Sequence, residues 1–275
     1  MDSVPELKRL HHVVTSTAVR YWLPWLLLLF AGCGVFELHP YEVRGGEQNL
    51  NVRALERLPR DTHEGSFRFA VMGDIGVFLK EAKDAMEDVA RRDVDFVVQL
   101  GDLTEFSSAQ EYDWVARLFD DVPVPALAVI GNHDLLGTGP QLFRHHFGSE
   151  YLTFDFGGSR FVLFDSNSRE YGYPGDVPDL DRLRAELIAP PCGGHLFTFS
   201  HVPPWHSDFD PSLRGPFEHL QAERNVAVSF HGHLHRFGSD AIEGVRYVVT
   251  DALELRRYLV VTVAGPTVHV EQVSY

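Results

Sequence analysis

The middle of the chain alternates short apolar runs with longer segments in which apolar residues recur every three or four positions. The order is strand, helix, strand, helix, strand, over residues 67–74, 78–92, 94–102, 107–121 and 124–134. Either Ser107 or Ser108 would cap the second helix. This order and spacing predict parallel strands joined by right-handed helical crossovers.

The second half of the chain is richer in strand patterns. A hairpin is predicted to turn at Gly157–Gly158, and a helix is predicted over residues 180–188. Further strands are predicted at residues 195–201, 226–232, 245–250, 257–263 and 267–273. No linker divides residues 67–275, so the pattern predicts a single α/β domain in which two packed, mixed β-sheets are flanked by helices.

The start of the chain has the pattern of a targeting segment. Basic residues precede the run YWLPWLLLLF, which is shorter than the ~20 apolar residues of a spanning helix and contains Pro24. The sequence FAGC at residues 30–33 resembles the lipobox of bacterial lipoproteins, with phenylalanine in place of the usual leucine. We therefore expect residues 1–32 to be a signal peptide and Cys33 to carry a lipid that anchors an exported protein to the membrane, facing the periplasm or the cell exterior. The alternatives are an ordinary secretory signal and an uncleaved N-terminal anchor.

Composition narrows the class of protein. The net charge of −15 disfavours binding to nucleic-acid backbones, which requires a basic surface. The two cysteines, Cys33 and Cys192, exclude a disulfide framework. Residues 33–66 mix proline, glycine and polar residues with little periodicity, so we expect a tether that packs in part onto the domain.

Each of the three predicted parallel strands ends in a glycine followed by a residue of metal-ligand type. These residues are Asp74, Asp102 and Asn132, and His133 follows the last of them. Because the carboxyl ends of parallel strands share one edge of a sheet, the side chains are expected to meet there. A single Gly-Asp pair would be ordinary turn chemistry, but three in succession indicate a site.

Two later strands add histidines to this pattern. One ends at His201, and the other runs into the sequence HGHLH at residues 231–235. In an extended strand the three histidines of HGHLH would project to the same face. Placing three imidazole rings together is unfavourable, because each can gain a positive charge, unless a metal accepts their lone pairs. This run therefore indicates a metal site.

These motifs resemble those of the calcineurin-like metallophosphoesterases. The matching sequences are GDIG, GDLTE, GNHD, SHVP and GHLH, at residues 73–76, 101–105, 131–134, 200–203 and 232–235. They follow the order of the family and cover nearly all of residues 67–275, and GNHD together with GHLH is a specific pair. The resemblance implies a four-layer sandwich and the hydrolysis of small phosphoric esters, either monoesters or diesters.

The resemblance also implies two divalent cations, which could be Mn, Fe or Zn. The ligands would be Asp74 and His235 on the first metal, Asn132, His201 and His233 on the second, and Asp102 bridging both. A hydroxide that bridges the cations would attack phosphorus, and His133 would protonate the leaving oxygen as the general acid.

Two positions depart from the pattern of many family members. Gly76 stands where many members have a histidine on the first metal. Glu105 stands where other members have an acidic residue that holds the catalytic histidine by a hydrogen bond. We expect Glu105 to orient His133, and the alternative is that it swings to the first metal in place of the missing imidazole.

Two other interpretations compete with a hydrolase. A non-catalytic, metal-binding lipoprotein on the same fold is favoured by Gly76 and opposed by His133, because a pure binding site gains nothing from an unliganded acid. The second competing interpretation is a protein without metal in which the histidines have a structural role. His231 has no implied role, and we expect it to fill space.

The sequence does not indicate the substrate or the oligomeric state. Tyr171, Tyr173 and Trp205 lie in predicted loops, where they could stack on a base or sugar or could simply pack.

Overall fold

The computed structural model describes residues 39–59, 66–190 and 193–275. The expected signal peptide, Cys33 and Cys192 lie outside these residues. Residues Pro40–Tyr275 form one compact unit. Among the described residues, no helix combines the length and the apolar character that a bilayer crossing requires.

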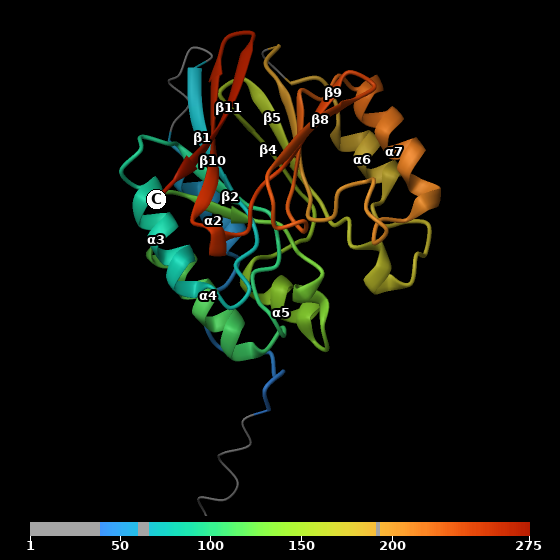
Figure 1. Ribbon diagram of the computed structural model, residues 1–275. Helices are drawn as coiled ribbons and strands as arrows, with labels where there is room; N and C mark the ends of the chain where they lie inside the picture. Colours follow the sequence, from blue (N-terminus) through green and yellow to red (C-terminus); the bar gives the residue numbers. More distant parts are fainter. Residues whose placement is uncertain (1–38, 60–65, 191–192) are drawn as a thin grey trace, which may run out of the picture. The chain divides into compact units, whose positions relative to one another are not determined.

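The first sheet has five strands in the order β11-β10-β1-β2-β3. Its strands are β1 (Ser66–Met72), β2 (Phe96–Gln99), β3 (Ala126–Ala128), β10 (Arg257–Ala264) and β11 (Thr267–Ser274). As predicted, β1, β2 and β3 are parallel, whereas β10 and β11 are antiparallel to their neighbours. Helices α3 (Leu79–Val89) and α4 (Ala109–Asp121) cover its outer face (Figure 1).

The second sheet has six strands in the order β4-β5-β6-β7-β9-β8. Its strands are β4 (Leu152–Phe156), β5 (Ser159–Leu163), β6 (Leu196–Phe199), β7 (Val228–His231), β8 (Gly238–Ile242) and β9 (Val245–Val249). Helices α6 (Leu180–Glu186) and α7 (Pro211–Glu223) lie on its outer side (Figure 1). The predicted α/β fold of two packed, mixed sheets between helices is therefore confirmed.

Phenylalanine side chains fill the space between the two sheets. Phe69 on β1 stacks on Phe96 on β2, with ring centroids 5.2 Å apart. From the opposite sheet, Phe161 and Phe197 meet Phe69 edge to face, at 5.5 and 5.4 Å. Burial of each such ring contributes about 1.5–3 kcal/mol, so this layer fixes the carboxyl ends of the two sheets relative to each other.

Local sequence accounts for the helices that were predicted. In α4, Ser108 rather than Ser107 is the N-cap, and it forms a capping box with Glu111. The apolar face of this helix then buries Tyr112 and Phe119 against the first sheet.

Helix α2 (Leu50–Arg57) lies within the segment that was expected to be a tether. The side-chain amide of Asn51 donates to the carbonyl of Ala128 at 3.0 Å and accepts from its N–H at 2.8 Å. Because β3 is an edge strand, this amide satisfies backbone groups that a further strand would otherwise pair. The compact unit accordingly begins at Pro40, earlier than the Phe67 at which the strand pattern starts.

Candidate metal centre

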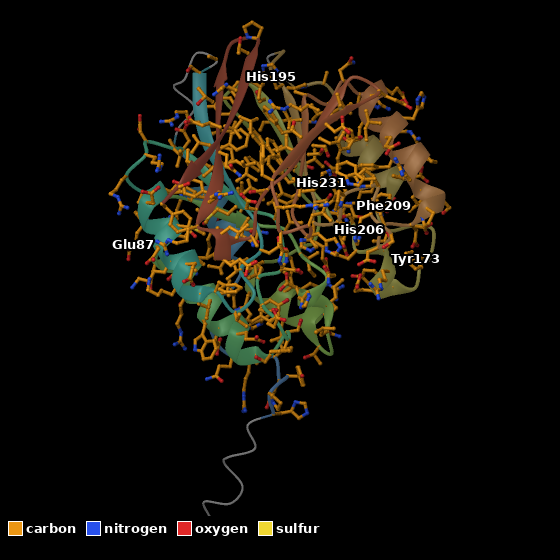
Figure 2. The ribbon with its side chains drawn as sticks, in the orientation of Figure 1. Glu87, Tyr173, His195, His206, Phe209 and His231 are labelled. Carbon is orange, nitrogen blue, oxygen red and sulfur yellow. The ribbon has the colours of Figure 1, made fainter. Side chains whose placement is uncertain are left out.

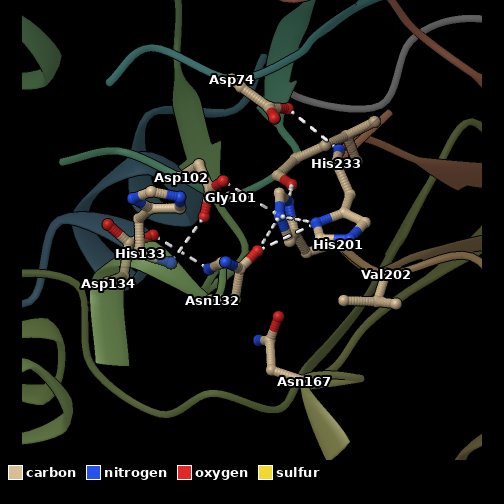
Figure 3. A network of polar contacts seen from close by, with 12 residues as sticks. Asp74, Gly101, Asp102, Asn132, His133, Asp134, Asn167, His201, Val202 and His233 are labelled. Carbon is tan, nitrogen blue, oxygen red and sulfur yellow. Dashed lines mark hydrogen bonds and ion pairs between the residues drawn. The ribbon is translucent and has the colours of Figure 1, made fainter. Parts of the chain in front are cut away.

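Five strand ends bring the predicted ligands to one place. Asp74, Asp102 and Asn132 follow β1, β2 and β3, while His201 follows β6. The loop after β7 carries the remaining two, His233 and His235. Figure 3 shows Asp74, Asp102, Asn132, His201 and His233 around a common space. The gathering of these residues, on which the interpretation of the sequence depended, is present in the structure.

Four of these side chains point ligand atoms at one another. Asn132 Oδ1 lies 2.9 Å from His201 Nε2 and 2.9 Å from His233 Nδ1. His201 Nε2 lies 3.3 Å from His233 Nδ1 and 3.3 Å from Asp102 Oδ2 (Figure 3). We call these four residues the buried group.

The hydrogen bonds of His201 show that the buried group fits a cation. Its Nδ1 lies 2.7 Å from the carbonyl of Leu100, which can only accept, so Nδ1 carries the proton. Nε2 then faces two oxygens that can only accept, Asn132 Oδ1 and Asp102 Oδ2. Although burial disfavours a charged ring, the Asp102 carboxylate raises the pKa of His201 to about 10. A positive charge is therefore favoured at this point, and a divalent cation would supply it.

The hydrogen bonds of His233 also fix which of its ring nitrogens is protonated, and burial lowers the pKa of this ring to about 4, so the ring is neutral. The backbone N–H of Asp208 donates to His206 Nδ1 at 3.3 Å, so this nitrogen is unprotonated. It must then accept from His233 Nε2, which lies 3.0 Å away. The lone pair of His233 is thereby placed on Nδ1, facing Asn132 and His201. A metal-binding histidine normally donates its other nitrogen in this way.

The sequence analysis assigned no role to His206 or Asp208. His206 lies on the loop between β6 and α7 (Figure 2). The buried carboxylate of Asp208 lies 3.4 Å from His233 Nε2 and pairs with Arg169 at 3.1 Å. Their contact with His233 joins distant parts of the chain, so local sequence could not predict it. The only sequence signal for these two residues was their position shortly after the SHVP motif.

Asp74, Asp102 and His235 form a second cluster, which we call the open group. Each offers one ligand atom, and these atoms lie within 4.8 Å of one another. Asp74 Oδ2 is 2.9 Å from His235 Nε2. The His235 side chain is 53% exposed, in contrast to the buried imidazole of His201. Asp102 belongs to both groups, as the bridging role requires.

Glu105 lies beside both the open group and His133. A Cβ added at Gly76 would lie 3.0 Å from Glu105 Oε2, so this carboxylate borders the position where many family members have an imidazole. The Glu105 carboxylate is 3.9 Å from His133 Nδ1. The ring is held instead by the backbone carbonyl of Glu105, to which Nδ1 donates at 2.9 Å.

His133 stands next to the ligands without joining either group. Its backbone N–H donates to Asp102 Oδ1 at 2.9 Å. Burial lowers the pKa of His133, but the Glu105 carbonyl and the Asp102 carboxylate outweigh it, so the net shift is upward. With Nδ1–H fixed to a carbonyl, Nε2 is the atom that is free to transfer a proton.

Asp134, the last residue of GNHD, holds the loops together. Its buried carboxylate accepts from the backbone N–H groups of Leu103, Thr104 and Gly131, at 3.1, 2.9 and 2.9 Å. Burial and the nearby Asp102 raise the pKa of Asp134 to about 7. A Cβ at Gly131 would lie 2.0 Å from the Asp102 backbone nitrogen, so only glycine permits this approach.

The three histidines of HGHLH do not share a face. Strand β7 ends at His231, and His233 and His235 adopt left-handed backbone angles, with φ of 68° and 54°. The extended run that would align the rings is therefore broken. His231 is fully buried between the hydroxyls of Ser200 and Ser229, at 3.1 and 2.9 Å. Burial lowers its pKa to about 3, so this ring is neutral and fills space.

A sequence profile of the calcineurin-like phosphoesterases matches residues 67–237. This range is more than half of the chain, and the protein belongs to the calcineurin-like phosphoesterase family. The resemblance inferred from the motifs is thus confirmed.

Two relatives are named probable cyclic nucleotide phosphodiesterases. The protein from Fibrobacter succinogenes is 25% identical over 184 residues, which cover 62% of this chain and 70% of the relative. The protein from Rhodopseudomonas palustris is 26% identical over 179 residues, which cover 58% of this chain and 64% of the relative. In the second case, the match spans less than two thirds of the relative's length.

Solved structures share the fold at lower identity. Purple acid phosphatase PPD1 from yellow lupin has a TM-score of 0.63 and 15% identity, over 78% of this chain and 52% of that one. GAP50, described as the anchor in the inner membrane complex of Plasmodium, has a TM-score of 0.60 and 14% identity, over 76% and 85%. These likenesses establish the architecture alone.

Proposed function

We propose that this protein is a metal-dependent hydrolase of phosphoric esters. The observation that carries the proposal is the place of Asp102 between two groups of ligand atoms, with His133 beside it and in neither group. A protein that only stored metal would not need an oriented acid at this position. Membership of the phosphoesterase family supports the same reaction.

The residues of both groups suit a pair of divalent cations. The buried group would hold one cation and the open group the other, with Asp102 shared. When bound, the cations would neutralise phosphoryl charge and lower the pKa of water. The donor set is nitrogen and oxygen without thiolate, which fits Mn, Fe or Zn.

His133 would act as the general acid. Its Nε2 gives a proton to the ester oxygen as the bond to phosphorus breaks, so the alcohol leaves in neutral form. The ring then stays neutral with its remaining proton on Nδ1, which the Glu105 carbonyl holds. The raised pKa of His133 keeps more of the ring in the proton-donating form near neutral pH.

A small phosphodiester is the substrate that we favour. The chain carries a net charge of −15, so polyanions would be repelled, whereas a diester brings a single negative charge. The names of the two relatives also refer to diester hydrolysis.

Hydrolysis of bis(p-nitrophenyl) phosphate by the full chain with added Mn²⁺ tests this proposal. We expect turnover that stops when a chelator removes the metal. If the metal content is confirmed in the sample and neither this diester nor p-nitrophenyl phosphate is hydrolysed, the proposal fails.

The alternative is a non-catalytic metal-binding protein on the same fold. Gly76 favours it, because the open group lacks the imidazole that many family members have. A protein with both cations bound and no turnover of either ester would have this function.

We also propose that the protein is exported and anchored by a lipid at Cys33. The support is the sequence of residues 30–33 after an apolar run. In the host, Cys33→Ser should move the protein from the detergent phase to the aqueous phase in detergent phase separation. Equal partitioning of both forms would contradict the anchor.

A further inference from the structure

A cavity of about 270 Å³ opens beside the loop that carries His233 and His235. Its lining includes Trp205, Leu234, Arg236, Phe237, Asp240 and Tyr247. The volume is slightly below the ~300–1,000 Å³ of pockets for drug-sized ligands. It is therefore suited to one flat ring system rather than to an extended molecule.

Gly238, the first residue of β8, is among the residues that line the cavity. Gly238 lies opposite Val249 in the register with β9, and Asp240 lies opposite Tyr247. Because side chains two residues apart share a face, Gly238 and Asp240 line the same side. A Cβ added at Gly238 would meet no atom within 4 Å, so a side chain at this position would extend into open space.

Trp205 and Phe237 line the cavity with partly accessible rings, and the fully buried Tyr247 packs against Trp205. The Trp205 ring packs edge to face on Tyr247, with centroids 5.7 Å apart, and on His231 at 6.1 Å. The backbone N–H of Phe237 donates to the Asp251 carboxylate at 2.8 Å, which fixes the loop, and Phe237 as a whole residue is 41% exposed. Rigid aromatic walls favour stacking on a flat ring.

The cavity adjoins the metal centre through two loops. Leu234 lies in the sequence between His233 and His235, and consecutive Cα atoms are about 3.8 Å apart. Trp205 precedes His206, whose Nδ1 is 3.0 Å from His233 Nε2. The cavity therefore lies against the loop that carries the predicted ligands His233 and His235.

The polar groups of the lining define the chemistry of the occupant. Arg236 supplies hydrogen-bond donors and Asp240 supplies acceptors, and both are exposed. Among aromatic walls, this combination suits a ring whose edge carries both acceptors and donors. A nucleobase has these properties, whereas an acyl chain or a bare sugar lacks the flat face.

We infer that this cavity binds the base of a nucleoside whose phosphoryl group lies at the metal centre. The inference rests on the proposed function, because it assigns a subsite to the same substrate. It also names residues that would set specificity, since Phe237, Trp205 and Arg236 would distinguish a nucleoside ester from a simple alkyl ester.

The test compares two phosphonates that cannot be hydrolysed, adenosine 5′-methylenephosphonate and methylphosphonate. Their affinities for the full chain loaded with Mn²⁺ are measured by titration calorimetry. Base stacking should make the adenosine compound bind at least about tenfold more tightly. Gly238→Leu fills the cavity without a backbone clash, so it should abolish this difference and leave the affinity for methylphosphonate unchanged.

A matched control lies on the same strand. Ala241 is exposed and is not among the residues that line the cavity, so Ala241→Leu should change neither affinity. Phe237→Ala should weaken only the adenosine compound, and Phe237→Tyr should restore its binding. If methylphosphonate binds and the adenosine compound binds no better, or if Gly238→Leu keeps the difference, the inference is wrong although the proposed function stands. If neither compound binds, the inference is wrong, and the hydrolysis of bis(p-nitrophenyl) phosphate decides separately whether the proposed function stands.

Discussion

The two groups of ligands share Asp102 and draw on the same HGHLH loop, but the fold holds them differently. In the buried group, His201 is fixed by a carbonyl at 2.7 Å and His233 by His206 at 3.0 Å. In the open group, Nδ1 of His235 lies 4.0 Å from the carboxylate of Glu254. The Glu254 side chain is 38% exposed. The buried imidazoles are oriented before any cation arrives, and the exposed one is not.

This difference leads us to expect that ligand identity alone does not set the affinity of each group for a cation. Both groups contain carboxylate and imidazole, yet only the buried group has its ring protons assigned by neighbouring atoms. Ordering a free side chain on binding costs conformational entropy, so we expect the open group to hold its cation more weakly. The missing imidazole at Gly76 acts in the same direction.

Removing the shared ligand should have the largest effect. Asp102→Ala takes a carboxylate from both groups, so we expect turnover to fall on the order of 10³-fold or more and both cations to be lost. Metal analysis of the purified variant beside its activity checks this. Retention of two cations would show that Asp102 does not bridge them.

Loss of the general acid should separate chemistry from metal binding. His133→Ala should lower turnover about 10²–10⁴-fold while the metal content stays close to that of the wild type. Since the acid must be protonated, turnover should fall as pH rises through the His133 pKa, which is shifted upward from its usual 6.5. The variant should lack this alkaline limb, and metal loss equal to that of Asp102→Ala would contradict the assigned role.

A pair of outer residues tests the comparison directly. His206→Ala removes the acceptor of His233 Nε2 and should weaken the tighter cation by about 10–100-fold. Glu254→Ala is the matched change beside His235 and should have little effect, because an exposed pair at this distance is worth little. Mn²⁺ titrations of both variants give the two affinities. Equal effects would remove the distinction between the groups.

Glu105 should give the smallest effect. Because the backbone carbonyl rather than the carboxylate holds His133, Glu105→Gln should lower turnover less than about tenfold. A loss comparable to that of His133→Ala, with metal retained, would restore the orienting role to the carboxylate. Loss of one cation would instead support Glu105 as a ligand in place of an imidazole at Gly76.

Much of the centre follows from local sequence. Asp74, Asp102 and Asn132 could be placed together because each follows a parallel strand, and such strands end at a common edge. The support of these residues could not be predicted in this way. The contacts of His206 with His233, and of Asp134 with Leu103, join loops that are far apart in the chain.

The helices that sequence analysis missed have weak local signals. Gly215 and Pro216 indicate a loop, yet they lie within α7. The Asp210 cap and the burial of Phe217 override this preference. In α2 the apolar pattern covers only two turns, and its stability comes from packing on β3.

The backbone at the metal centre links metal uptake to the stability of the whole fold. Asp102, His233 and His235 all have left-handed backbone angles, with φ of 50°, 68° and 54°. Residues other than glycine rarely adopt these angles. The folded chain bears this strain and also gathers carboxylate, amide and imidazole groups at one point. Cations bind the folded state and shift the unfolding equilibrium by mass action. The melting temperature of this protein should therefore rise as its metal sites fill, and it can be measured before any substrate is known.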